Sequence, residues 1–340
     1  MPFSLPFFIR SRSARACRTS LLPALLGLAS PTLAQQPLPR DTSFTVHSAF
    51  VKARKQHPAI SIARPPVPRN VRTAAGLTYC TMPGGRALQL DAFYPRARRR
   101  QQFPAVLIIH GGGWRSGDRS QHVPLAQQLA AQGYVAVTAE YRLSTEAPYP
   151  AAVQDLKAAL RWLRANPAQL PIDTTRLAVW GFSAGGQLAA LVGTTPDDPR
   201  FEAGSCYRSR STRVQAIVDA DGILAFIHPE SGEGDDRKST SAATHWFGVG
   251  KDAAPALWQQ ASALSYISAQ TPPMLFLNSG VARMHAGRDD VRQRLTALGI
   301  YSEVQEFPEA PHPFPLFNPW FEPTLRYTVA FLNRVLKPGR

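Results

Sequence analysis

Short apolar runs alternate with amphipathic segments over the last two thirds of the chain. The runs are apolar at consecutive positions, as strands buried on both faces require, and the segments between them have helical spacing. We expect strands at 105–110, 134–139, 176–180, 214–220 and 274–278. We expect helices near 121–132, 150–165, 184–193, 287–298 and 322–337. This alternation predicts an α/β fold with a doubly wound, mostly parallel sheet.

The segment before this alternation has a different pattern. Two strand-like runs, 77–81 and 87–94, flank Pro83-Gly84-Gly85, which is typical of an antiparallel hairpin. We expect this hairpin at the amino-terminal edge of the sheet, within a domain covering 71–340. Residues 35–70 are Pro-rich and poorly patterned, and we interpret them as a linker or a surface wrap.

The alternation fails over 223–265, where loop-rich sequence precedes Trp246, Phe247 and Trp258. We interpret this segment as a small lid-like insertion over the carboxyl ends of the strands, where open α/β sheets bind ligands. The alternative is an ordinary connecting helix with its own core aromatics.

The amino terminus has the features of an export signal. Arginines precede a short apolar stretch, 21–29, and Thr32-Leu33-Ala34 offers small residues at the positions that a signal peptidase reads. We expect a signal peptide over 1–34, cleavage after Ala34, and a secreted or periplasmic mature protein. The alternative is an Arg-rich terminus of a cytosolic protein.

Composition excludes several classes of protein. The chain has 340 residues, of which 44% are hydrophobic and 18% charged, so it can bury a large core. No stretch beyond the first 35 residues is long and apolar enough to span a bilayer, so we expect no stable membrane insertion. Cleavage of the signal would leave two cysteines, Cys80 and Cys206, which an oxidising compartment would permit to pair.

The chain carries a net charge of +15, which falls to 15 − 4 = +11 without the four arginines of the signal. Basic residues are scattered apart from the run at 96–100 (RARRR), and no nucleic-acid module is present. We therefore expect no nucleic-acid partner, and at most a mild attraction to an acidic polysaccharide. The oligomeric state does not follow from the sequence.

The first chemical motif is Gly181-Phe182-Ser183-Ala184-Gly185, a G-x-S-x-G pattern. It follows the apolar run RLAVW and opens a helix-like segment, which is the context that a nucleophile elbow needs. Glycines permit the tight approach of strand and helix at such an elbow. The motif predicts Ser183 as a nucleophile, and the alternative is a tight structural turn.

The second motif, His110-Gly111-Gly112-Gly113-Trp114, follows directly after the run AVLIIH. Tandem glycines let backbone N–H groups approach a substrate oxygen, as in the first oxyanion-hole loop of α/β-hydrolases. We predict the amides of Gly112, Gly113 and Ala184 as the oxyanion hole. We interpret His110 as a structural hydrogen-bonding residue.

The general base is expected late in the chain, after the last strand. His312, in the loop FPEAPHPFP after the strand-like IYSEVQEF, fits this place. His285 is a competing candidate, but it follows the preceding strand, where the acid of a triad normally lies.

The acid is the least determined member of the site. The strand at 274–278 is followed by Val281-Ala282-Arg283 where an acid is expected. Asp289 is our first choice, since it is the next acid along the chain together with Asp290. Glu309 and Asp221 remain candidates, the latter directly after the strand at 214–220.

At this point the chain resembles a known family. GFSAGG, HGGGW, EYRLSTEAPYPAAVQD, LDAFYP, HAGRDD and PHPFPLFNPWFEPT together are similar to the acetylxylan/feruloyl esterase-like α/β-hydrolases of the BD-FAE type, over roughly residues 65–337. The resemblance implies an α/β-hydrolase fold and a secreted carbohydrate esterase, with Ser183 as nucleophile and His312 as base. The missing acid after the strand at 274–278 departs from the common hydrolase pattern.

We therefore predict a serine carboxylester hydrolase that removes acetyl or feruloyl esters from plant-type polysaccharide. We expect it to need no cofactor and no metal, because Ser183, His312 and an acid suffice for acyl transfer. The alternatives are a lipase-like or small-acyl esterase, an arylformamidase on the same machinery, or a non-catalytic carbohydrate-binding protein.

Overall fold

A computed structural model describes residues 41–96, 98, 100–202 and 206–337, and the predicted signal peptide with its cleavage site lies outside these residues. Within them, eight strands form one sheet in the order β2-β3-β5-β4-β6-β7-β8-β9. The bounds of these strands are β2 Val71–Thr81, β3 Ala87–Pro95, β4 Phe103–Ile109, β5 Val135–Ala139, β6 Ile172–Phe182, β7 Ala216–Ala220, β8 Met274–Ser279 and β9 Ser302–Phe307.

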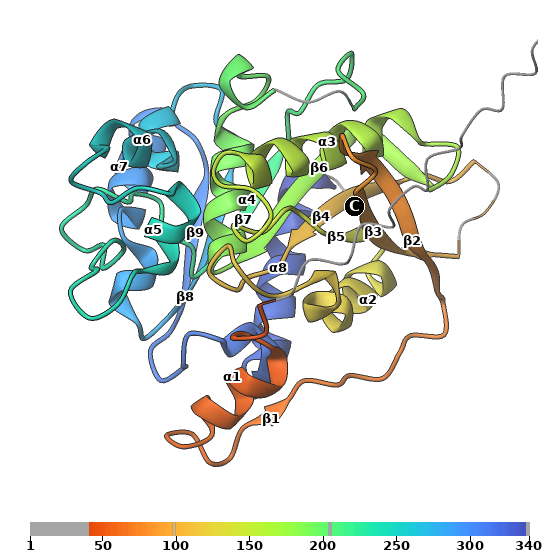
Figure 1. The fold of residues 1–340 in the computed structure, drawn as a ribbon. Coiled ribbons are helices and arrows are strands. Elements are labelled where there is room, and N and C mark those ends of the chain that lie inside the picture. Colours follow the sequence, from red (N-terminus) through yellow and green to blue (C-terminus); the bar gives the residue numbers. More distant parts are fainter. Residues whose placement is uncertain (1–40, 97, 99, 203–205, 338–340) are drawn as a thin grey trace, which may run out of the picture. The chain divides into compact units, whose positions relative to one another are not determined.

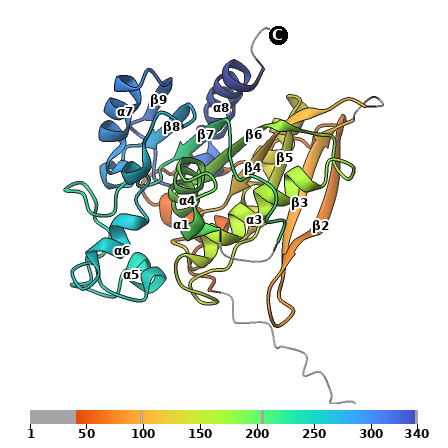
Figure 2. The same ribbon diagram turned by 90° about the horizontal axis from the view of Figure 1, so that it is seen from above.

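The sheet is mostly parallel, with its antiparallel pairs at one end. β3 pairs antiparallel with β2 and β5, whereas the strands from β5 through β4 to β9 pair in parallel. The two edge strands, β2 and β9, lie at opposite ends of the sheet in Figure 2. This arrangement confirms the predicted doubly wound sheet with an antiparallel edge hairpin.

Helices cover both faces of the sheet, and strand β4 shows why. Its residues are buried on both sides, and Ala105, Leu107 and Ile109 pack into one core while Val106 and Ile108 pack into the other. Side chains alternate across a strand, so a continuously apolar strand needs a helical layer on each face. Apolar residues of α3 (Ala151–Ala165) and α4 (Ala184–Thr194) belong to the first core, and those of α2 (Val123–Ala131) and α8 (Phe321–Leu336) to the second.

The remaining elements are short. They are α1 Val46–Ala53, α5 Ala242–Phe247, α6 Pro255–Gln260, α7 Arg288–Ala297, the two-residue strands β1 Ser61–Ile62 and β10 Phe317–Asn318, and 3₁₀ turns at Arg119–His122, Pro199–Phe201, Ala263–Tyr266, Ala282–His285 and Phe314–Leu316. Figure 1 shows how these elements are arranged around the sheet. Among the described helices, none has the length and apolar character needed to cross a membrane.

The described part of the Pro-rich segment 35–70 carries a helix and a short strand. Thr45 and Ser48 form a reciprocal capping box at the start of α1, with N–H···O distances of 2.9 and 3.0 Å. Farther along, β1 pairs with β10, Ser61 opposite Asn318. This pairing places the segment beside the loop that precedes α8.

The segment 223–265 contains buried aromatic residues and also reaches the cavity beside Ser183. Trp246, Phe247 and Trp258 are buried in the core beside α3 and α4, as a connecting segment with its own aromatics requires. Ring stacking links them: the Phe247 and Trp258 centroids lie 4.3 Å apart. The same segment also contributes Glu233 and Ala242 to the cavity described below.

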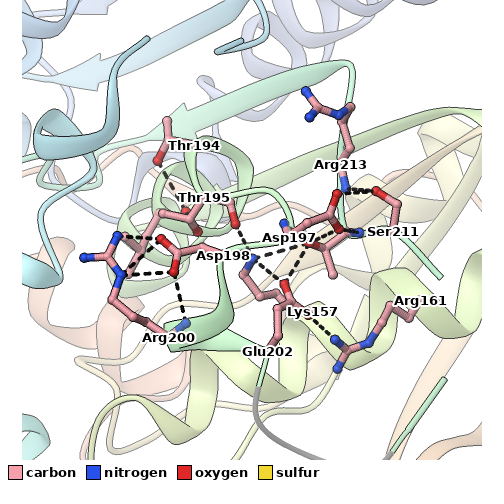
Figure 3. Close-up of polar contacts among 12 residues, drawn as sticks. Lys157, Arg161, Thr194, Thr195, Asp197, Asp198, Arg200, Glu202, Ser211 and Arg213 are labelled. Atoms are coloured by element: carbon pink, nitrogen blue, oxygen red, sulfur yellow. Dashed lines mark hydrogen bonds and ion pairs between the residues drawn. The ribbon is translucent and has the colours of Figure 1, made fainter. Parts of the chain in front are cut away.

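A disulfide and a cluster of buried charges fix the segment that follows α4. Cys80 on β2 is bonded to Cys206, with their Cα atoms 5.8 Å apart. Lys157 of α3 is fully buried and donates to Glu202 at 2.8 Å, while Arg161 pairs with the other oxygen of the same carboxylate and donates to the Cys206 carbonyl at 3.1 Å (Figure 3). One carboxylate thereby pairs with two buried cations, which would otherwise be costly to bury.

Candidate active site

Ser183 lies at a sharp turn between β6 and α4. Its φ of 57° is in the left-handed region, which is strained for a residue with a side chain. The flanking glycines explain why the turn is possible: a Cβ on Gly181 would lie 1.9 Å from the Gly185 carbonyl oxygen, and one on Gly185 would lie 2.2 Å from that of Ile109. The Ser183 N–H donates to Ala220 at 2.8 Å, which holds the turn against the end of β7. This is the geometry of the predicted nucleophile elbow.

His312 reaches Ser183 from the loop after β9. Its Nε2 lies 2.8 Å from Ser183 Oγ, and its Nδ1 lies 2.9 Å from Asp221 Oδ2. With the proton on Nδ1, the imidazole donates to Asp221 and accepts from the Ser183 hydroxyl. The structure thus brings together Ser183 and His312, as the sequence predicts, and adds Asp221 as the third member.

Asp221 is held in place on both oxygens. Its side chain is fully buried at the end of β7, and Oδ1 accepts from the Ser279 N–H of β8 at 2.8 Å while Oδ2 accepts from His312. The residue has a φ of 52°, a left-handed conformation that turns the chain away from the strand. A carboxylate anchored in this way fixes the orientation and tautomer of the imidazole.

The structure does not bring Asp289, the first choice from the sequence, to His312. Asp289 is in the first turn of α7, where its side chain is 68% exposed and pairs with Arg288 at 2.9 Å. Asp290 contacts His228 at 3.0 Å, and Glu309 is exposed. The expectation assumed an acid after β8, whereas Asp221 follows β7, the neighbouring parallel strand, whose carboxyl end lies at the same edge of the sheet.

The histidines that the sequence left as alternatives have other contacts. His110 is buried, with Nδ1 2.9 Å from the Gly111 carbonyl oxygen and its ring stacked on Tyr141 at 4.4 Å. His285 lies in the 3₁₀ turn before α7, and the pKa of its imidazole is lowered by burial and by the charge of Arg288.

The glycine loop lies beside the elbow. Gly112 has a φ of 127°, and a Cβ there would lie 2.2 Å from the Ser116 carbonyl oxygen, so this position needs glycine. Trp114 anchors the loop by donating from Nε1 to Gln187 Oε1 of α4 at 2.9 Å. Ala184 is the first residue of α4, where the first N–H groups have no acceptor within the helix.

A cavity of about 180 Å³ opens beside Ser183. It is lined by Gly113, Trp114, Ser183, Ala184, Asp221, Ile223, Glu233, Ala242, Arg283 and Met284. The nucleophile and two of the three predicted oxyanion donors, Gly113 and Ala184, therefore face one space, and Gly112 adjoins it in the chain. Such a space can hold an ester carbonyl between the hydroxyl and the amides.

Sequence reasoning missed two charged residues of this cavity, Glu233 and Arg283, and preferred Asp289 to Asp221 among the candidate acids. A signal for Asp221 was present, because Asp221-Gly222 follows directly after a buried strand while the end of the next strand lacks an acid. Glu233 and Arg283 have no such signal, since they are distant in the sequence and meet only through the fold. Within the described residues, no group of His, Cys, Asp or Glu side chains is arranged to hold a metal ion.

A family model described as BD-FAE matches residues 90–282, more than half of the chain, including Ser183 and Asp221. The chain belongs to the BD-FAE family. This family match agrees with the resemblance seen in the motifs.

Relatives of this BD-FAE member are named as ester hydrolases. It is 31% identical over 248 residues to a probable carboxylic ester hydrolase, LipM, of Mycobacterium tuberculosis, covering 69% of this chain and 55% of the relative. The chain thus spans little more than half the length of this curated relative.

Solved structures establish the fold. A truncated carbohydrate esterase from gut microbiota matches with a TM-score of 0.63 and 19% identity, over 77% of this chain and 96% of that one. Esterase 2 of Thermogutta terrifontis, with butyrate bound, matches with a TM-score of 0.64 and 24% identity, over 80% and 97%. The BD-FAE chain therefore has the α/β-hydrolase fold predicted from its motifs.

One further acid supports the turn that presents Asp221 in this BD-FAE member. Asp219, on β7, accepts from the Gly222 N–H at 2.8 Å through Oδ1, while its Oδ2 is buried with no hydrogen-bond partner in the described part of the chain. Burial raises the pKa of Asp219 well above its ordinary value, and the nearby charge of Asp221 raises it further. The folded protein therefore keeps a proton on Asp219 at pH values where the unfolded chain has lost it.

This difference gives a pH-dependent prediction for Asp219→Asn. Because the folded state binds the extra proton, stability falls as pH rises above the ordinary carboxyl range. An amide resembles the protonated acid and does not titrate, so the melting temperature of the variant should rise relative to the parent between pH 4 and pH 8. Thermal melts across this range test it, with the exposed Asp252→Asn as the control. A difference that is the same at every pH would contradict the prediction.

Proposed function

We propose that this protein is a serine carboxylester hydrolase. The observation that carries the proposal is the chain of contacts from Ser183 through His312 to Asp221, beside a cavity that Gly113 and Ala184 also line. Hydroxyl, imidazole and carboxylate at these distances are the components of acyl transfer. The names of its relatives support the same reaction class.

The geometry gives a two-stage mechanism. Ser183 Oγ attacks the ester carbonyl while His312 Nε2 takes its proton, and Asp221 stabilises the imidazolium that forms. The N–H groups of Gly112, Gly113 and Ala184 stabilise the tetrahedral oxyanion, an effect of about 3 kcal/mol for each donor. His312 then protonates the leaving alcohol, and a water that it activates releases the acid from Ser183.

The substrate that we propose is an acetyl side-chain ester of plant-type polysaccharide. Two observations support a small acyl group on a carbohydrate. The cavity of about 180 Å³ is below the range of about 300–1,000 Å³ of pockets that enclose drug-sized ligands, which favours acetyl over feruloyl. One structural neighbour is named a carbohydrate esterase, and its likeness to this chain is one of fold.

Acid release from a panel of esters tests the function and its substrate. The panel contains acetylated xylan, acetylated pectin, feruloylated arabinoxylan, a triglyceride, p-nitrophenyl acetate and N-formylkynurenine, each assayed with the parent and with Ser183→Ala. We expect acetate release from acetylated polysaccharide by the parent only. Release from the triglyceride or N-formylkynurenine alone would favour a lipase-like enzyme or an arylformamidase. Equal release by Ser183→Ala would exclude Ser183 as the nucleophile.

We also propose export from the cytoplasm. The charged amino-terminal region, the short apolar stretch and Thr32-Leu33-Ala34 support it, and so does the disulfide between Cys80 and Cys206, a bond that persists in oxidising compartments. We expect the mature protein to begin near Gln35. Amino-terminal sequencing of the natively produced protein tests this, and an intact Met1 would contradict it.

A further inference from the structure

Two charged side chains in the cavity beside Ser183 have no part in the Ser183–His312–Asp221 contacts. Glu233 comes from the segment between β7 and α5, and Arg283 comes from the 3₁₀ turn after β8. Glu233 Oε1 accepts from Arg283 Nη1 at 3.2 Å. Because a buried carboxylate is costly, the placement of Glu233, whose side chain is 14% exposed, requires an explanation beyond packing.

The backbone of Glu233 is held in position, and its carboxylate has unused capacity to accept hydrogen bonds. The Lys251 ammonium donates to the Glu233 carbonyl at 3.2 Å, and the Glu233 N–H donates to Ser231 Oγ at 3.3 Å. The side chain is only 14% exposed. A carboxylate accepts up to four hydrogen bonds. Within the described residues, the Glu233 carboxylate accepts from Arg283, through Oε1. Oε2 is therefore available to accept from a ligand in the cavity.

Arg283 supplies the complementary donors. Its side chain is 51% exposed, and one of its five N–H groups is committed to Glu233. An acceptor and several donors thus lie side by side on one wall, whereas Trp114, Ile223, Ala242 and Met284 line other parts of the same cavity with apolar surface. To the Ser183 hydroxyl and the Gly113 and Ala184 amides in the same cavity, this wall therefore adds polar groups that can orient a ligand.

The pair lies in the same cavity as Ser183 and Asp221, the two residues that contact His312. His312 must protonate the leaving oxygen, so the alcohol lies near its Nε2. An alcohol bound there shares this cavity with the Glu233 carboxylate and the Arg283 guanidinium.

The chemistry of the pair selects among alcohols. An anionic group would be repelled by Glu233, and a cation by Arg283. An alkyl alcohol would cover the carboxylate without giving it a hydrogen bond, which is costly. A neutral hydroxyl next to the ester oxygen donates to the carboxylate and accepts from the guanidinium.

We propose that Glu233 and Arg283 determine specificity for the alcohol, by binding a hydroxyl group vicinal to the ester oxygen as found on a sugar ring. The inference rests on the proposed ester hydrolysis at Ser183. It adds the residues that distinguish sugar esters from alkyl and aryl esters.

Two synthetic esters that differ by one hydroxyl test this without assuming a particular sugar. They are trans-2-hydroxycyclohexyl acetate and cyclohexyl acetate, assayed with the full-length mature chain. We expect the parent to prefer the hydroxy ester in kcat/KM. Glu233→Leu should lower the ratio of the two kcat/KM values about tenfold or more, as loss of a hydrogen bond to a charged group does. Glu233→Gln, which keeps the shape and a neutral acceptor, should lower it less, and Asp252→Asn, an exposed carboxylate of the same insertion, should leave it unchanged.

The outcomes separate the inference from the function. If both esters lose activity equally in Glu233→Leu and in Glu233→Gln, Glu233 acts on His312 or on folding and the specificity role is overturned. If the ratio is unchanged in both variants, the residue does not contact the alcohol, which also overturns it. If the folded parent hydrolyses neither ester nor any member of the panel above, the proposed function is wrong. The inference, which depends on that function, is then wrong as well.

Discussion

Replacing Asp221 with Asn is expected to lower kcat by about 10⁴ while leaving the fold intact. Asp221 accepts the Nδ1 proton of His312 at 2.9 Å, so it keeps Nε2 unprotonated and ready to accept from Ser183. An amide in its place can present an N–H to Nδ1, which favours the wrong tautomer and removes the charge that stabilises the imidazolium. The same change in the serine-protease triad costs about 10⁴ in kcat. Steady-state kinetics on p-nitrophenyl acetate measure the effect.

Asp289→Asn is the matched control for Asp221→Asn. Its carboxylate is exposed and pairs with Arg288 on the surface, so we expect kcat within about twofold of the parent, since an exposed ion pair contributes little. Asp290→Asn and Glu309→Gln should behave in the same way. A near-normal kcat for Asp221→Asn, with a collapse in one of the other three variants, would show that another carboxylate orients His312.

Removing the disulfide by Cys80→Ser together with Cys206→Ser should lower the free energy of unfolding by about 5 kcal/mol. The bond joins residues 126 positions apart, and the loop-closure entropy that it removes from the unfolded chain grows with this separation. A domain of this size loses roughly 2 °C in melting temperature for each kcal/mol, so we expect a decrease of about 10 °C. Differential scanning calorimetry measures it.

A reductant provides the control for the disulfide variant. Dithiothreitol should lower the melting temperature of the parent to that of the double variant and leave the double variant unchanged. Equal melting temperatures of the oxidised parent and the double variant would contradict the prediction. The effect on kcat should be small, because Cys206 follows the carboxyl end of α4, whereas Ser183 immediately precedes its first residue.

Much of the fold follows from the sequence because its strands are apolar on both faces and its helices are amphipathic. The helix predicted at 150–165 is observed at Ala151–Ala165, and the strand predicted at 274–278 at Met274–Ser279. Helix α1 was not predicted, since it is short and lies among prolines, and its capping box gives a weaker signal than periodicity. Helix and strand periodicities arise locally, so a single sequence contains them.

The site was predictable only where local backbone geometry determines it. Ser183 and the glycine loop follow from strand-to-helix and strand-to-loop turns that need particular residues at adjacent positions. Asp221 and Glu233 depend on which segments meet across the carboxyl edge of the sheet, which the sequence does not encode locally. Asp289 was predicted because the acid was expected after β8. The carboxylate that contacts His312 instead follows β7, the neighbouring strand.

The carboxylate that contacts His312 and the cavity residue Arg283 come from the ends of two different strands, because Asp221 follows β7 and Arg283 follows β8. Because Asp221, which follows β7, contacts His312, the turn after β8 does not have to supply this carboxylate. That turn instead contributes Arg283 to the cavity. A library that randomises Val281, Arg283 and Met284 would therefore alter selectivity with little loss of turnover. This chain is accordingly a favourable starting point for the directed evolution of new ester preferences.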